Sequence, residues 1–224
     1  MKKVVLFIAL ITFVVNAAMA KLDKNLKCTL TLLDGTTVSG YMVDYKTKTI
    51  SDGPTHLHNM VSLKIASKPD GEGVEYSAND SKKLVIKTKE GDSEFLSAYI
   101  MKNCTRPKNM KHGKTKCFIA VIYKQKGVYG LVSEASDFIT YRSFNDVVSS
   151  KISTITYLYC LEGDEVVIPY WNPSDKLTIG AKGGLRLCFE RFPKVVEYIK
   201  SDEFSMKMMK SNPLNILDIV GAYK

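Results

Sequence analysis

The chain concentrates its positive charge in one short segment. Residues 102–117 carry six cations and no acidic residue: Lys102, Arg106, Lys108, Lys111, Lys114 and Lys116. A protruding loop with this charge can hold an anionic partner such as lipid headgroups, an acidic polysaccharide or an acidic protein surface. Nucleic acid fits less well, because no Phe, Tyr or Trp stands between Cys104 and Cys117 to stack on a base. The alternative is a solvated hairpin loop whose lysines keep a sheet edge soluble.

Two of the five cysteines stand at the two ends of this basic loop. A disulfide between Cys104 and Cys117 would close a loop of about 14 residues and contribute roughly 3 kcal/mol in the chain-entropy account. The alternative is a pair of reduced thiols on neighbouring strands. No cysteines have the C-x-x-C spacing of a redox or zinc site. Because the number is odd, at least one thiol is free or pairs between chains.

The histidines give little support for catalysis or metal binding. The chain has only His56, His58 and His112, and no G-x-S-x-G or S-x-x-K motif accompanies them. His56 and His58 are two residues apart, so on a strand both rings would share a face and could reach one metal ion. No third ligand stands at a recognisable spacing. We therefore expect two exposed loop histidines, no metal site and no cofactor.

Two acidic clusters are the most obvious candidates for carboxylate chemistry. They are Asp70, Glu72 and Glu75, and Glu162, Asp164 and Glu165. A facing pair of carboxylates could hydrolyse a glycosidic bond in an envelope or extracellular polymer. Both clusters fall on expected turns, where solvated acids are ordinary. We therefore expect no catalytic residue, and a carboxylate-based hydrolase is the alternative function.

The first twenty residues have the composition of a secretory signal peptide. Met1-Lys2-Lys3 is cationic, residues 4–15 are almost entirely apolar, and Ala18-Met19-Ala20 offers small side chains to a signal peptidase. No later apolar run approaches the roughly 18 residues needed to span a bilayer. The sequence therefore predicts an exported protein, periplasmic or extracellular, with no transmembrane segment after signal removal. Its charge outside the basic loop would then be close to neutral.

Short β-rich runs separated by turn signals fill residues 26–169. Cys28–Leu33 and Thr36–Asp44 flank Asp34-Gly35, which predicts a hairpin with a type I′ turn. Lys126-Gly127 indicates a second tight turn. Met60–Ala66 alternates apolar and polar side chains with period two, as a half-buried strand does.

Helical signals come late in the chain. Pro193–Lys200 has apolar residues at helical spacing, Ser205–Lys210 is a further candidate, and Asn212-Pro213 offers an N-cap and first-turn proline for a last helix. A short helix at Phe144–Ser149 is also a candidate. We expect Gly180–Gly184 to join the strands to this tail.

Strands that precede helices, rather than alternate with them, favour an α+β, mainly β fold. We expect an antiparallel sheet or barrel-like β region followed by a short C-terminal helical tail. The expected division is a signal peptide at 1–20, a β-rich domain at 21–180 and a helical tail at 185–224. This tail would pack on the β-rich domain through five side chains: Val195, Val196, Ile199, Leu217 and Val220.

Three parts of the chain resemble a group of uncharacterised exported proteins of Bacteroidetes-type bacteria. The first is the early hairpin at residues 33–41, and the second combines residues 74–80 with residues 118–129. The third is the tail, at residues 192–204 and 216–223. The resemblance implies an exported β-rich protein and brings no known activity or binding residues.

These patterns together favour a binding role over catalysis. We expect a non-enzymatic envelope or secreted interaction protein that contacts an anionic surface or a protein partner through its basic loop. The oligomeric state is open at this point.

Overall fold

The computed structural model describes residues 24–52, 55–104, 108, 110–142, 147–172 and 181–222. The expected signal peptide at 1–20 lies outside the described residues. Within the described part, strands come first and helices last, which confirms the mainly β, α+β class. The strands are β1 (Leu26–Leu32), β2 (Thr37–Asp52), β3 (Thr55–Ala66), β4 (Val74–Ser77), β5 (Ser81–Thr88), β6 (Gly91–Lys102), β7 (Lys111–His112), β8 (Cys117–Gln125), β9 (Val128–Arg142), β10 (Val147–Leu161) and β11 (Val166–Trp171), with a 3₁₀ turn, η1 (Ala78–Asp80), after β4.

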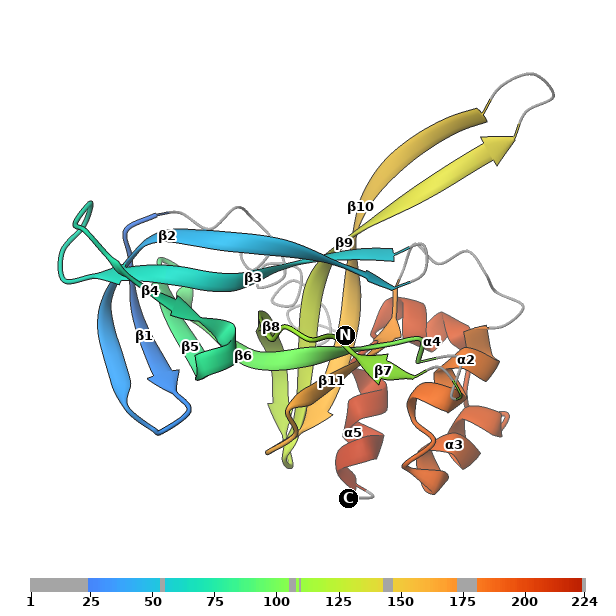
Figure 1. Cartoon of the computed structure of the whole chain (residues 1–224). Coiled ribbons are helices and arrows are strands. Elements are labelled where there is room, and N and C mark those ends of the chain that lie inside the picture. Colours follow the sequence, from blue (N-terminus) through green and yellow to red (C-terminus); the bar gives the residue numbers. More distant parts are fainter. Residues whose placement is uncertain are drawn as a thin grey trace.

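The strands form one mostly antiparallel sheet in which two closed rings share a wall, and β3 also pairs with β9. Strands β3, β2, β1, β5, β6 and β8 make the first ring, which closes where Met60 pairs with Phe118. Strands β6, β8, β9, β10 and β11 make the second ring, which closes where Val166 pairs in parallel with Tyr99. Strands β6 and β8 are therefore a wall shared by both rings. Beyond the rings, β9 and β10 continue as a two-stranded arm (Figure 1).

The two faces of the shared wall belong to different hydrophobic cores. Phe95 and Phe118 lie in the first core, whereas Ala98, Ile100 and Ile119 lie in the second. Successive side chains of a strand point to opposite faces, so one strand can serve both cores. Because neither face of the wall meets water, β8 begins with an unbroken buried run rather than an alternating pattern.

The two predicted hairpin turns differ in backbone geometry. Lys126 and Gly127 both have positive φ, 48° and 69°, between paired Gln125 and Val128, as a type I′ turn requires. At the first hairpin only Gly35 has positive φ, 91°, so the predicted type I′ turn at Asp34-Gly35 is wrong. The loop there runs between the paired residues Thr31 and Thr37, so it is longer than a two-residue turn. The Asp34 carboxylate accepts a hydrogen bond from the Thr36 backbone N–H at 2.8 Å, which stabilises a turn without positive φ at Asp34.

The helices are α2 (Ala181–Cys188), α3 (Pro193–Lys200), α4 (Met206–Ser211) and α5 (Asn215–Ala222). α3 covers the residues predicted for it. Gly183 and Gly184, expected in a linker, lie inside α2, because Leu185 and Cys188 anchor that helix in the core and packing overrides the low helix propensity of glycine. In the candidate helix at Phe144–Ser149, residues 147–149 belong to β10, and the rest lies outside the described residues.

The helical tail packs on β9, β10 and β11 (Figure 1). Val195, Ile199, Leu217 and Val220 are buried as predicted. Val196 is only half-buried and lines a groove between α2 and α3 instead. None of the helices in the described part is both long and apolar enough to cross a membrane.

Two tyrosines of the sheet fix the tail by directed contacts. The Tyr159 hydroxyl donates a hydrogen bond to the Cys188 carbonyl oxygen at 2.7 Å, and its ring stacks on Phe189 with centroids 4.6 Å apart. The Tyr170 hydroxyl donates to the Pro213 carbonyl oxygen at 3.1 Å. A buried hydroxyl needs such a partner. These bonds therefore set where the helices sit on the strands.

Candidate anion-binding surface

The basic loop begins and ends on the shared wall of the two rings. Lys102 is the last residue of β6, and Lys111 is the first residue of the short strand β7. Lys108, Lys111 and Lys114 are exposed, and Lys102 is half-buried. Arg106 lies outside the described residues. Four predicted cations therefore occupy the accessible part of this region.

Lys102 and Lys111 form a like-charge pair across β6 and β7. They are direct partners in the antiparallel register. Residues in that position share a face with Cβ atoms about 4.5–5.5 Å apart, and like charges there repel. Among the described residues, no acidic side chain forms an ion pair with either lysine. An anion over the pair would relieve the repulsion.

Lys116, the last predicted cation, has a different role. It is only 5% exposed, and its ammonium donates a hydrogen bond to the Glu165 carboxylate at 2.8 Å. The same ammonium lies 5.2 Å from the centre of the Tyr99 ring, within the range of a cation–π contact. The Lys116 hydrogen bond lowers the pKa of Glu165. Lys116 therefore anchors the end of the loop on β6 and β11.

His112 contacts the same aromatic ring. It pairs with Met101, and its ring centre lies 4.8 Å from that of Tyr99 at an angle of 43°. The Gly113 backbone N–H donates a hydrogen bond to the Ile100 carbonyl oxygen at 3.1 Å. Tyr99 thus contacts both His112 and Lys116, and these contacts fix the strand that carries Lys111.

A further cation comes from a distant strand. The Lys48 ammonium, on β2, donates a hydrogen bond to the Thr115 hydroxyl at 3.4 Å. Nothing in the local sequence around this lysine indicates that position, because the contact depends on how β2 crosses the loop. We call Lys48, Lys102, Lys108, Lys111 and Lys114 the basic surface.

The expected disulfide between Cys104 and Cys117 is absent. Both are free buried thiols, Cys104 in the first core and Cys117 in the second. The shared wall separates those cores, so the two ends of the loop direct their thiols into different interiors. Burial raises the pKa of Cys117 and of Cys160 to about 12, and that of Cys28 to about 11.

The histidine pair lies on a strand rather than in a loop. His56 and His58 are both in β3, and the His56 side chain is outside the described part. Nδ1 of His58 hydrogen-bonds the Thr49 hydroxyl at 3.0 Å. No cluster of three or more potential metal ligands occurs among the described residues.

The acidic clusters serve structural contacts. Glu75 accepts hydrogen bonds from the Lys46 ammonium and the Ser62 hydroxyl, each at 2.7 Å, and the bond from Lys46 lowers its pKa. Asp164 accepts from Arg191 at 2.9 Å, and Asp70 accepts from the Asn25 side chain at 2.6 Å. Glu72 and Glu162 are exposed. These carboxylates therefore hold turns and strands together.

No family model, no curated protein and no solved structure matches the chain.

Proposed function

We propose that this protein is an exported, non-enzymatic binding protein that contacts an anionic partner through its basic surface. The main support is the like-charge pair Lys102 and Lys111 on the paired strands β6 and β7. Neither lysine has an acidic partner in the described part. Unpaired charges held at short separation favour a ligand of the opposite charge. The signal-like residues 1–20 place the protein in the periplasm or outside the cell in this proposal.

The basic surface includes lysines from three different strands, which favours a partner with several negative charges. Lys48 approaches from β2, whereas Lys102 and Lys111 belong to β6 and β7. We expect a partner with several negative charges to contact more of these ammonium groups than one compact anion would. A lipid headgroup layer, an acidic polysaccharide or an acidic protein face is such a partner. We do not propose the hydrolase, because Glu75, Asp164 and Glu165 are occupied by cationic partners.

Binding to anionic vesicles and to dextran sulfate tests this function. Reversal of Lys108, Lys111 and Lys114 to Glu should abolish binding to both, and raising the salt concentration should weaken binding of the native protein. A matched variant carries the same charge change at Lys82, Lys87 and Lys89, which are exposed on β5 and the turn after it. That variant should bind much more strongly than the loop variant. Equal loss in both variants, or binding unaffected by salt, would contradict the proposal.

A further inference from the structure

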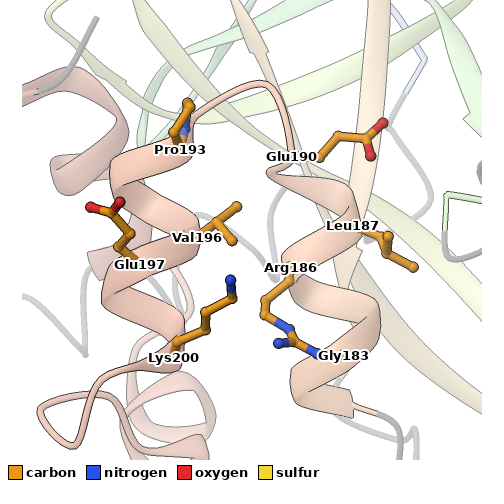
Figure 2. A pocket seen from close by; sticks show the side chains of 8 residues that line it. All are labelled: Gly183, Arg186, Leu187, Glu190, Pro193, Val196, Glu197 and Lys200. Carbon is orange, nitrogen blue, oxygen red and sulfur yellow. The ribbon is translucent and has the colours of Figure 1, made fainter.

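A shallow groove of about 600 Å³ separates α2 from α3 (Figure 2). Each side contributes four residues spaced as one face of a helix, at i, i+3, i+4 and i+7. They are Gly183, Arg186, Leu187 and Glu190 on one side and Pro193, Val196, Glu197 and Lys200 on the other. The opposite faces of these helices are buried, through residues such as Leu185 and Val195. The groove is therefore a second face of the helical pair, directed away from the core.

Charge is unevenly distributed along this groove. At one end, the side chains of Arg186 and Lys200 point toward one another from the two helices (Figure 2). Val196 lies between that end and the other, where Glu190 and Pro193 stand, while Leu187 and Glu197 lie along the two outer edges with side chains that point away from each other (Figure 2). Neither cation forms an ion pair within the described part of the chain. Two converging unpaired cations repel, so this end favours an anionic group.

We propose that the groove binds an amphipathic helix of a partner protein. Its apolar face would lie on Leu187 and Val196, and its acidic side chains would lie on Arg186 and Lys200. This site is separate from the basic surface and does not depend on the function proposed for it. An open groove leaves one side of its occupant in water, which suits a helix with a polar outer face better than an acyl chain.

The charges also specify the direction of the bound helix. A helix carries partial negative charge at its C-terminal end and partial positive charge at its N-terminal end. The acidic C-terminal end would therefore lie on Arg186 and Lys200, and the N-terminal end near Glu190. Eight-residue helices are about 12 Å long, so the contact would cover about two turns of the partner.

Two synthetic helical peptides of identical composition test the site and the direction. Both carry one apolar stripe; the first has Glu at its C-terminal end and Lys at its N-terminal end, and the second has these charges exchanged. Titration of the full chain, followed by amide NMR shifts, should show the first peptide perturbing Gly183, Leu187 and Val196. The second can match its end charges to the groove only in the opposite direction, which sets its helix dipole against those charges, so it should bind severalfold more weakly.

Charge reversal at the groove gives the control. The R186E/K200E variant should bind the first peptide severalfold more weakly than the native protein does, because the groove then has acids at both ends and cannot match both ends of the peptide. Its matched variant, K207E/K210E, carries the same charge change at exposed positions of α4 outside the groove and should keep the native preference. Unchanged binding of the first peptide by R186E/K200E, equal binding of both peptides by the native protein, or no shift at groove residues with either peptide would overturn the proposal.

Discussion

The Tyr123 hydroxyl on β8 donates a hydrogen bond to the Asp218 carboxylate on α5 across 2.7 Å. The two residues are 95 positions apart in the chain, so this bond joins the shared wall of the rings to the last helix. Burial of Tyr123, followed by its hydrogen bond to Asp218, raises the pKa of the phenol. The proton therefore stays on Tyr123 at physiological pH, and the bond keeps its donor.

Loss of this hydroxyl should weaken the docking of the tail. We expect Tyr123→Phe to lower the free energy of unfolding by about 1–2 kcal/mol, because a hydrogen bond to a charged acceptor contributes about that much. Urea unfolding measures the change. Tyr76→Phe, at a half-buried phenol for which the structure gives no hydrogen bond, is the control and should change stability by less than about 0.5 kcal/mol. Asp218→Ala with Tyr123→Phe should be non-additive; simple additivity would show that the two residues do not interact.

Gly130 on β9 should not tolerate a side chain. A Cβ atom there would lie 2.7 Å from Leu217 Cδ1 and 2.9 Å from Tyr123 Cβ, closer than carbon atoms can pack. Gly130→Ala should therefore push α5 away from the sheet and cost roughly 1–3 kcal/mol of stability. Gly113→Ala is the control, since its Cβ would meet only the Thr115 carbonyl oxygen at 3.9 Å. Equal unfolding midpoints for the two variants would contradict this packing.

The ion pair between Lys116 and Glu165 should make stability depend on acidic pH. Its hydrogen bond lowers the pKa of Glu165 in the folded state, so the unfolded state binds the proton more readily. The stabilisation is complete above the unfolded pKa of about 4.3 and is lost as the pH falls through the lower folded value. Glu165→Gln should therefore be less stable than the native protein at pH 7. The difference should shrink as the pH is lowered below about 4.

Urea midpoints across this pH range provide the measurement. Glu72→Gln, at an exposed acid in another turn, should follow the native curve. A gap between Glu165→Gln and the native protein that is constant with pH would show that the Glu165 charge does not stabilise the fold.

Local pattern is enough to predict most strands and helices of this chain. Alternation at Met60–Ala66 and the turn at Lys126-Gly127 act within a few residues, so their physics is visible in the sequence. Closure of the rings cannot be predicted in this way, because it depends on pairings between residues that are distant in the sequence, such as Met60 with Phe118. The buried run at the start of β8 is the one local sign that both faces of this strand are covered.

The candidate site, too, is only partly predictable from the sequence. The run of cations in the basic loop is visible in the sequence, but the burial of Lys116 depends on Glu165, 49 residues further on. The contribution of Lys48 depends on how β2 crosses the loop near Thr115. The role of Tyr99, which contacts both His112 and Lys116, has no local signal, since a tyrosine in a strand is ordinary.

The five cysteines should be chemically protected in the folded protein. None of the five forms a disulfide and all are buried, and burial raises the pKa of Cys28, Cys117 and Cys160 to about 11, about 12 and about 12. Since the thiolate is the reactive form, we expect labelling of these three thiols at pH 8 to be on the order of 100-fold slower than labelling of an exposed thiol. Glu72→Cys, on an exposed turn, supplies that reference. Urea should release all five thiols for labelling. Rapid labelling of the native protein would contradict the burial of the thiols. A mass lowered by the two hydrogens that a disulfide removes would contradict the separation of Cys104 and Cys117 into two cores.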